Sequence, residues 1–289
     1  MQQKVIFDCD NTMGLRWNEI DDGLTLLYLL SREEINLLGV TTTFGNNTIE
    51  NVWKATSKLR DMYDFDLPLK MGEGQRHQPP TEAAEFLVEQ VNLYPGEVSI
   101  LATGPLGNLR AAKELDTDFF QKTKQVVCMG GMVKQPMVMG GQTLSELNFS
   151  ADPEGTLSVL HAECPVIIMN AHVCLQVPFQ WRHALRAKGW HPKIAWWRNL
   201  WHFGFGLKFR QHAFYLWDLL PAVYLTNPEL FSENPVKISS SLQDLEDGTL
   251  IIADEGQSIN MPDRIIDPKQ FYEILFRGWE QFFNTYTNR

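Results

Sequence analysis

The alternation of short apolar runs with segments of helical periodicity constrains the fold of this chain more than any other feature. Apolar runs of strand length stand at residues 4–10, 35–44, 67–71, 98–103, 125–129 and 165–169. Segments with helical spacing of apolar residues follow or separate them, at residues 21–31, 48–60, 81–91, 106–115 and 152–162. Strands that alternate with helices predict an α/β fold with an open, mostly parallel sheet and helices on both faces.

The second half of the chain has a less regular pattern. Residues 181–217 are rich in Trp, Phe and His. We expect this segment to be helical, with aromatic side chains that pack in the core or at a subunit interface rather than line a ligand site. We further expect a buried helix at 215–225, a strand pair over 236–253 with a turn at Asp247 and Gly248, and a closing helix at 268–283.

Composition limits the class of protein and its partners. The chain is 44% hydrophobic and 21% charged, which is typical of a folded domain. Its net charge of −10 repels phosphate backbones, so we expect no nucleic-acid partner and a small-molecule ligand instead. No apolar stretch approaches the roughly 18–20 residues that cross a bilayer, so we expect no membrane partner. No linker rich in Pro, Gly or Ser interrupts the chain, which predicts a single domain over residues 1–289.

The cysteines and the N-terminus indicate the compartment. Cys9, Cys128, Cys164 and Cys174 show no metal-ligand spacing, and each sits in an apolar run that predicts a buried strand or its end. The first four residues lead straight into a strand without the apolar segment of a signal peptide. We therefore expect a cytoplasmic protein with reduced thiols.

Polar residues follow several of the predicted strands. Asp8 and Asp10 end the first strand, Asn46 follows the second, Thr103 follows a later one, and Gly130 comes after the strand at 125–129. Ligands of open α/β sheets bind beyond the carboxyl ends of the strands. These residues are therefore candidates for a binding site.

An acidic cluster stands between the first strand and the first helix. Asp8, Asp10, Asp21 and Asp22 lie within fifteen residues of one another, and four crowded carboxylates repel unless a hard cation joins them. The alternative is a solvated loop in which Asp21 or Asp22 caps the helix.

One known signature fits this segment locally. FDCDNT, residues 7–12, resembles the haloacid dehalogenase phosphatase motif, which would make Asp8 a phosphoryl-accepting nucleophile. That chemistry also requires a downstream Lys and a second acidic pair at suitable strand ends. The sequence offers no convincing candidates for either, so the resemblance is confined to six residues.

A second resemblance extends over almost the whole chain. An apolar strand followed by Asp8, Asp10, and then the pair Asp21 and Asp22 at a helix start resembles the inosine-uridine preferring nucleoside hydrolase family. Five more blocks follow in the family's order: TTTFGN with Asn46, ATGPLGNL with Thr103, VVCMGG through Gly131, ELNFSADPEG with Glu146 and Asn148, and FYLWDLLPAVYL with Trp217 and Asp218. Each block is weak alone, but six in order are specific.

The resemblance implies a metal-dependent reaction. In the family's pattern Ca²⁺ is bound by the carboxylates of Asp10, Asp22 and Asp218 and by the backbone carbonyl of Thr103. Oxygen-only ligation is what Ca²⁺ prefers. The implied activity is hydrolysis of the N-glycosidic bond of a ribonucleoside, which gives free base and ribose and passes through an oxocarbenium-like sugar.

The resemblance also implies roles around the reacting carbon. Asp10 is the expected general base for the attacking water, and Asn46 the residue that orients water or sugar. Asp8 is expected to support the Asp10 loop rather than to bind the ion.

Other residues are expected to hold the sugar. Asp21 would bind a ribose hydroxyl, Asn148 the 2′/3′ side, and Glu146 the region of the 5′-hydroxyl. Met129 would touch the ribose, with core packing as the alternative. The family pattern further implies a homodimer or homotetramer.

Three features depart from the family's usual pattern. Trp217 stands where many members have a His that protonates the leaving base, and it resembles the purine-specific inosine-adenosine-guanosine branch, in which an indole stacks on the purine. Leu147 stands where that branch has a second stacking Trp, and Phe86 is a candidate for the third aromatic. Gly140, Gly141 and Gln142 replace the region that carries an Asn for the 5′-hydroxyl.

The turn between Asp10 and Asp21 is also longer than usual. Residues 11–20 must form an extra loop, from which Arg16, Trp17 or Glu19 could reach substrate.

The sequence therefore predicts a Ca²⁺-dependent, purine-preferring ribonucleoside hydrolase with Asp10, Asn46 and Trp217 as catalytic residues. Three alternatives stay open: a nucleoside hydrolase with broad or pyrimidine preference, the phosphatase, and a nucleoside-binding protein without catalysis.

Overall fold

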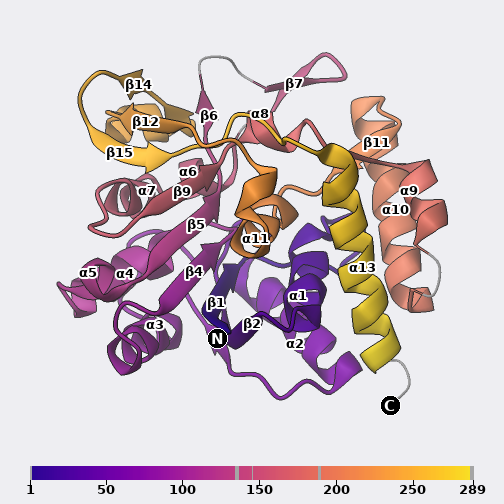
Figure 1. Cartoon of the computed structure of the whole chain (residues 1–289), viewed down its shortest axis with the longest axis horizontal. Helices are drawn as coiled ribbons and strands as arrows, with labels where there is room; N and C mark the ends of the chain where they lie inside the picture. Colours follow the sequence, from indigo (N-terminus) through magenta and orange to yellow (C-terminus); the bar gives the residue numbers. More distant parts are fainter. Residues whose placement is uncertain (1, 134–136, 145, 188–189, 287–289) are drawn as a thin grey trace.

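The computed structural model describes residues 2–133, 137–144, 146–187 and 190–286. A nine-stranded sheet runs through the middle of the molecule in the order β14-β12-β15-β9-β5-β4-β1-β2-β3 (Figure 1). Its strands are β1 (Gln3–Cys9), β2 (Ile35–Thr42), β3 (Leu69–Met71), β4 (Val98–Ala102), β5 (Gln125–Met129), β9 (Val166–Met169), β12 (Pro235–Ile238), β14 (Ile252–Ala253) and β15 (Gln257–Asn260).

The order of the strands creates a switch point beside β1. From β15 to β3 all neighbouring strands are parallel, whereas β12 pairs antiparallel with both β14 and β15. The chain first builds β1, β2 and β3 toward one edge and then continues with β4, β5 and β9 toward the other. The carboxyl ends of β1 and β4 therefore face a crevice where such folds bind ligands.

Helices cover both faces of the sheet, so the predicted fold class is confirmed. One face carries α3 (Glu82–Leu93), α4 (Gly107–Leu115), α5 (Phe119–Lys122) and α7 (Pro153–Leu160). The other face carries α1 (Asp21–Ser31), α2 (Ile49–Tyr63), α11 (Leu219–Thr226) and α13 (Pro268–Tyr286). The element bounds lie within about three residues of those expected from periodicity.

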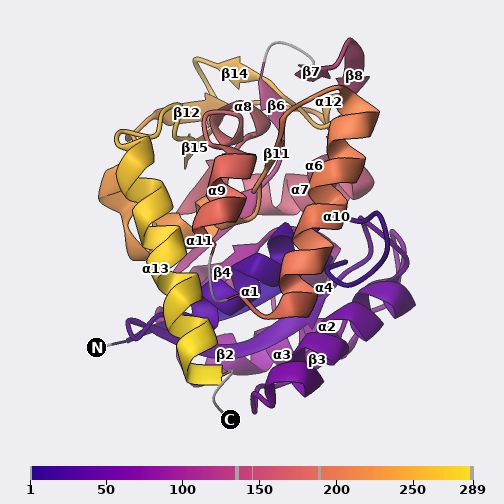
Figure 2. The same cartoon turned by 90° about the vertical axis from the view of Figure 1, so that its right-hand side faces the viewer.

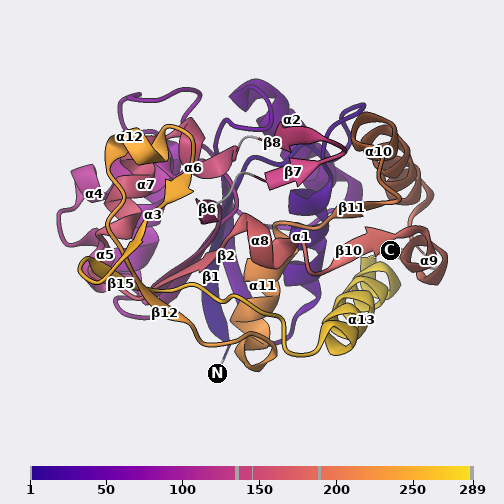
Figure 3. The same cartoon turned by 90° about the horizontal axis from the view of Figure 1, so that it is seen from above.

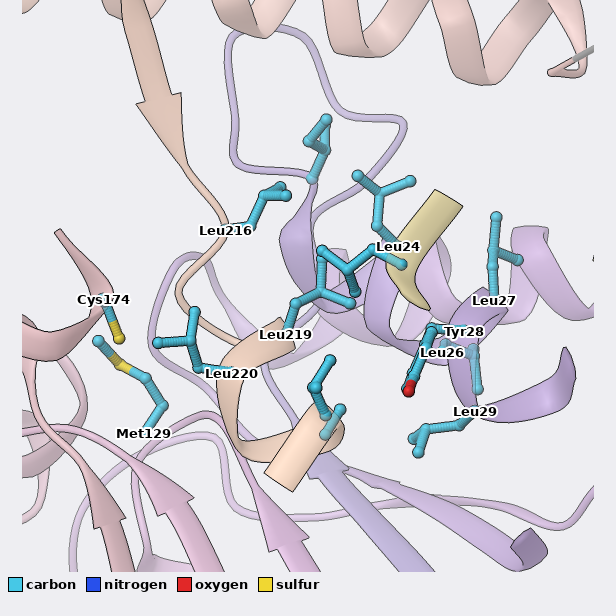
Figure 4. Close-up of a cluster of buried hydrophobic side chains, with 14 of the residues drawn as sticks. Leu24, Leu26, Leu27, Tyr28, Leu29, Met129, Cys174, Leu216, Leu219 and Leu220 are labelled. Atoms are coloured by element: carbon cyan, nitrogen blue, oxygen red, sulfur yellow. The ribbon is translucent and has the colours of Figure 1, made fainter. Parts of the chain in front are cut away.

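Side-chain alternation along β1 divides the core in two. Val5 and Phe7 face the cluster that includes α1 and α11, and Ile6 faces the cluster under α3 and α4. Figure 4 shows Leu24 of α1 and Leu219 of α11 meeting in the first cluster. Burying a Leu side chain stabilises the fold by about 1.5–3 kcal/mol, so these helices are fixed by packing. The starts of α1 and α11 are thereby held next to the end of β1.

The aromatic-rich segment differs from the all-helical expectation. It contains α9 (Trp181–Arg186), α10 (Pro192–Phe209) and β11 (Ala213–Tyr215), and β11 pairs antiparallel with β10 (Pro178–Gln180), which directly precedes the segment. Phe179 and Phe214 lie opposite each other in this pair and are fully buried. The helix α10 ends where Arg210 adopts a left-handed φ of 52°. Figure 2 shows α10 beside α9, with the indigo loop of residues 11–20 against it.

The expected strand pair at 236–253 is present but interrupted. β12 and β14 do pair, yet α12 (Leu242–Leu245) intervenes because Ser241 and Asp244 form a capping box. Beyond it, β13 (Thr249–Leu250) leaves the main sheet and pairs with β6 (Met132–Val133).

Smaller elements complete the described part of the chain: β7 (Met137–Met139), β8 (Gln142–Leu144), α6 (Asn148–Ala151), α8 (Ala171–Cys174) and the 3-10 helix at Pro228–Leu230. In Figure 3 the hairpin of β7 and β8 lies next to the end of α10, where Gly140 approaches the backbone of Phe209. Among the described helices, none combines the length and the hydropathy needed to span a bilayer. The four cysteines are buried and free, although Cys174 ends the short helix α8 rather than a strand.

Candidate active site

Four carboxylates from three separate elements meet below the switch point. Asp10 follows β1, Asp21 and Asp22 form the first turn of α1, and Asp218 directly precedes α11. Each of them is at most 4% exposed. The positive ends of two helix dipoles point at this cluster and offset part of its negative charge. The chain thus brings together residues that are about two hundred positions apart.

Burial and mutual repulsion make these acids hard to ionise. Burial raises the pKa of Asp10 to about 7, and the charge of Asp21 adds to the effect. Burial likewise raises the pKa of Asp21 to about 6. The pKa values of Asp22 and Asp218 are raised well above the usual range by burial and by the neighbouring carboxylates. Asp22 acts on the pKa of Asp10, and Asp218 acts on that of Asp21, so ionisation of one acid affects its neighbours.

The donor set fits a hard cation. Asp21 Oδ2 is buried without a hydrogen-bond partner, and the side chains of the cluster offer only oxygen atoms. In the described part of the chain, no three His, Cys, Asp or Glu side chains already stand in the geometry of a metal cage. A cation would relieve the repulsion between the carboxylates, which requires small movements of their side chains.

Gly45 and Asn46 shape the other side of Asp10. Gly45 has a φ of +150°, and a Cβ at this position would lie 2.1 Å from Asp10 Oδ2. The absence of a side chain lets the backbone approach, so Asn46 N donates to Asp10 Oδ2 at 2.6 Å and Asn46 Nδ2 to Oδ1 at 3.3 Å. Asn46 therefore fixes the orientation of the Asp10 carboxylate.

Thr103 and Asn148 link the cluster to the next strands. Thr103 Oγ1 donates to Asp22 Oδ1 at 2.6 Å. Asn148 Nδ2 donates to the carbonyl of Thr103 at 3.0 Å and to that of Met129 at 3.1 Å. The side chain of Asn148 thus holds the ends of β4 and β5 in a fixed relation.

A cavity of about 370 Å³ opens above the carboxylates. Polar residues line part of it: Asn46, Thr103, Asn148, Glu146, Glu19 and Asp218. Aromatic residues form a wall of the same cavity: Trp201, Phe205, Phe209 and Trp217. This volume is suited to a small molecule with a polar end and a flat apolar end.

The aromatic wall is a continuous set of ring contacts. The rings of Phe205 and Phe209 are 4.6 Å apart, and those of Trp201 and Phe205 are 5.6 Å apart. Tyr215 connects α10 to Trp217, with ring centroids 5.2 Å apart. Such offset and edge contacts hold the rings in place and leave faces free for stacking.

Comparison with known protein families decides what this arrangement is. The family model described as inosine-uridine preferring nucleoside hydrolase matches residues 5–273. This chain belongs to that family. It is therefore a nucleoside hydrolase, a glycosidase that cleaves the bond between sugar and base.

Curated relatives and solved structures agree with the family. Uridine nucleosidase 1 of Arabidopsis thaliana is 29% identical, with 80% of this chain and 76% of the relative covered. Probable uridine nucleosidase 1 of Oryza sativa subsp. japonica is 30% identical, with 74% of this chain and 75% of the relative covered.

The fold is shared with solved nucleoside hydrolases. The plant nucleoside hydrolase PpNRh1 superposes with a TM-score of 0.83 at 19% identity, covering 96% of this chain and 99% of the other. A purine-preferring ribonucleoside hydrolase from Gardnerella vaginalis gives a TM-score of 0.85 at 17% identity, covering 98% and 100%.

In this nucleoside hydrolase, Asp8 lies behind the cavity rather than in it. Its Oδ1 accepts hydrogen bonds from Thr41 Oγ1 at 2.5 Å and Asn108 Nδ2 at 2.8 Å. Burial raises its pKa to about 6. Asp8 is fully buried behind the Asp10 loop, and membership of the nucleoside hydrolase family excludes the phosphatase interpretation.

Glu146 lines the cavity, but its carboxylate already has protein partners. Glu146 Oε1 accepts from the backbone N–H of Asn148 at 2.9 Å, and Oε2 accepts from that of Ser150 at 2.8 Å. These bonds fix the start of α6 and thereby the position of Asn148. A contact with the 5′-hydroxyl stays a prediction.

The expected origin of the aromatic wall is wrong. Phe86 is buried on the opposite face of the sheet against Gly39, so it cannot reach the cavity. Leu147 does line the cavity, but the stacking surface comes from Trp201, Phe205 and Phe209 of α10. The expectation that this segment would not line a ligand site is therefore wrong for these three residues. Their spacing, i, i+4 and i+8, places them on one helix face and is a signal that could have indicated a wall.

The extra loop contributes one residue to the cavity. Arg16 and Trp17 are exposed at the surface, and Trp17 packs on Gly204 of α10, whereas Glu19 lines the cavity. Sequence reasoning missed Lys208, which also lines it from α10. Gln142, in the Gly-rich region that replaces the family's Asn, lines the rim on β8.

Proposed function

We propose that residues 1–289 act as one Ca²⁺-dependent ribonucleoside hydrolase that prefers purine nucleosides and releases free base and ribose. The observation that carries this proposal is the position of four buried carboxylates under a cavity with an aromatic wall. The polar end suits a ribose and the aromatic end suits a base.

The cation would be held by Asp10, Asp22, Asp218 and the carbonyl of Thr103. Enzymes of this family depend on a metal ion. Four oxygen donors leave room for water and ribose hydroxyls in a Ca²⁺ shell of six to eight. When bound, the ion supplies charge that acidifies and orients the attacking water.

The protein's own groups move the proton and hold the sugar. Asp10, oriented by Asn46, accepts the proton of the attacking water. Asp21, with its unpartnered Oδ2, binds a ribose hydroxyl, and Asn148 faces the 2′/3′ side. Met129 and Glu146 contact the remainder of the ribose from the cavity wall. Asp8 supports the loop from behind through its hydrogen bonds to Thr41 and Asn108.

Trp217 would receive the base. An indole is no acid near neutral pH, so Trp217 acts by stacking, which makes the purine ring easier to protonate as it leaves. It is half-buried, lines the cavity and continues the aromatic wall of α10. A larger stacking surface favours the larger bicyclic bases, which supports the purine preference.

The second candidate is a broad or pyrimidine preference. The first relatives are named uridine nucleosidases, whereas the Gardnerella structure is of a purine-preferring enzyme. The test is kcat/KM for inosine and uridine, measured by base release with Ca²⁺ present. We expect inosine to be the better substrate, and faster uridine cleavage would contradict the purine preference. Binding of both nucleosides without base release would indicate the non-catalytic alternative.

We also propose a cytoplasmic homodimer or homotetramer with the nucleoside as its small-molecule partner. Four buried free thiols suit a reducing compartment. Light scattering of the purified protein tests the assembly, and a monomer at micromolar concentration would contradict it.

A further inference from the structure

Glu19 occupies a defined place although it belongs to the extra loop. Thr12 Oγ1 donates to the carbonyl of Glu19 at 3.0 Å, and Asn47 Nδ2 donates to Asn18 Oδ1 at 3.2 Å. Gly14 lies against the Trp197 ring, and Trp17 covers Gly204. The loop is therefore fastened to α10 and to the turn after β2, and the Glu19 side chain is held toward the cavity.

Lys208 approaches the same cavity from the aromatic wall. Its Nζ lies over the Phe209 ring at 4.9 Å from the centroid. Phe205, three residues earlier on α10, brings its ring to the cavity on the same side. The ammonium group therefore stands beside the aromatic wall and lines the same cavity.

Glu19 and Lys208 interact electrostatically without forming an ion pair. Burial and the charges of Asp21 and Asp10 raise the pKa of Glu19, and Lys208 lowers it. No ion pair within 4.0 Å joins Glu19 and Lys208, both of which the structure describes. A hydrogen bond with Asn46 also lowers the pKa of Glu19. An acceptor and a donor therefore face one cavity with space between them.

We propose that Glu19 and Lys208 select bases that carry a lactam edge, a ring N–H beside a C=O. Glu19 accepts a hydrogen bond from the N–H, and Lys208 donates one to the C=O. Hypoxanthine, guanine and uracil offer this edge. Adenine and cytosine present an amino group beside an unprotonated ring nitrogen, which leaves Lys208 facing an amino group. This inference rests on the proposed function, because it assumes that the base lies at the aromatic wall.

The experiment compares inosine with adenosine, which differ only at this edge. For the wild type we expect kcat/KM to favour inosine. Glu19→Gln replaces a charged acceptor by a neutral amide, whose NH₂ can also donate to the unprotonated ring nitrogen of adenine, and Lys208→Met removes the donor. Each variant should therefore lower the inosine-to-adenosine ratio at least about tenfold. Uridine and cytidine form a second pair with the same edge difference and should show the same trend.

Matched controls separate recognition from general damage. Glu50→Gln on α2 and Lys193→Met at the start of α10 change the same charges at exposed positions and should leave the ratio unchanged. Thermal unfolding of each variant reports on folding. Equal losses on both nucleosides together with weaker Ca²⁺ binding would place Glu19 in the metal site and overturn the inference, as would an unchanged ratio in both variants.

Measuring how tightly free bases bind separates a failure of this inference from a failure of the proposed function. If no nucleoside released its base, the proposed function would fail. The dissociation constants of hypoxanthine and adenine, measured by calorimetry for the wild type and both variants, would still decide the role of Glu19 and Lys208. Preference for hypoxanthine that is lost in both variants supports the inference, and equal affinities in the wild type overturn it.

Discussion

Asp10 is the residue on which the geometry of the site converges. It accepts hydrogen bonds from the backbone and side chain of Asn46, and it has Gly45 closer than any side chain would allow. A small displacement at this position would move a general base away from the water it activates. Positioning errors of about 1 Å cost about a hundredfold in rate in enzymes generally.

Replacing Gly45 tests this dependence on backbone approach. In Gly45→Ala the new Cβ would lie 2.1 Å from Asp10 Oδ2, and the φ of +150° is strained for alanine. We expect kcat for inosine to fall about a hundredfold while the fold is retained. Gly96→Ala is the control, because Gly96 has a φ of +75° but nothing within 4 Å of its Cβ position. Equal activity in both variants would contradict the role given to Gly45.

The sequence predicted the acidic residues better than their surroundings. The ordered motifs of the family pointed to Asp10, Asp21, Asp22 and Asp218, whereas the crowding of the first three, taken alone, was also compatible with a solvated loop. The hydrogen bonds around these acids could not be predicted in the same way. The cap formed by Glu146 for α6 and the link from Asn148 to Thr103 depend on tertiary distances that no local pattern specifies.

At the scale of elements, α10 and the loop of residues 11–20 together build one side of the site. The aromatic wall comes from one helix face, and the loop is packed against the same helix through Trp17. The short strands β10 and β11 were missed because three-residue strands gain their stability from a partner about 35 residues away. The interruption by α12 is local, and the Ser241 capping box could have indicated it.

The position of Trp201 in the aromatic wall predicts how its removal changes the KM for inosine. In Trp201→Ala a half-buried stacking surface is lost, so KM for inosine should rise about tenfold with a smaller change in kcat. Trp196→Ala removes an indole that is 57% exposed on the same helix, and it serves as the control. Steady-state kinetics of both variants decide the point. A similar KM in both would mean that the base does not rest on α10.

At the scale of the whole molecule, the sheet order determines where chemistry takes place. The chain places β2 and β3 on one side of β1 and β4, β5 and β9 on the other, which leaves a crevice at the carboxyl ends of β1 and β4. The helices α1 and α11 begin at this crevice. Strand and helix periodicity predicted the parallel sheet, because central strands buried on both faces are nearly continuous in hydrophobicity. Periodicity does not specify strand order, so the crevice itself had to come from the structure.

The buried acids also make the stability of the ion-free protein depend on pH. Asp8 and Asp21 have folded pKa values of about 6 and Asp10 of about 7, all above the usual value near 3.9. An acid whose pKa is higher in the folded state than in the unfolded state stabilises the fold while it is protonated. This stabilisation is complete below the unfolded pKa and is lost as the pH rises through the folded pKa. With chelator, the free energy of unfolding should fall from pH 4 to pH 7, and Ca²⁺ should reduce this fall. Urea titrations measure it. A rise in stability over this range without the ion would contradict the account.

The most direct test of the central claim is base release from inosine by the wild type and by Asp10→Asn, each with chelator and with added Ca²⁺. The account predicts turnover by the wild type that chelator abolishes and Ca²⁺ restores, and a loss of at least about a thousandfold in Asp10→Asn with weaker Ca²⁺ binding by calorimetry. Asp66→Asn, at an exposed position, should behave as the wild type. Undiminished base release in chelator, or by Asp10→Asn, would contradict it.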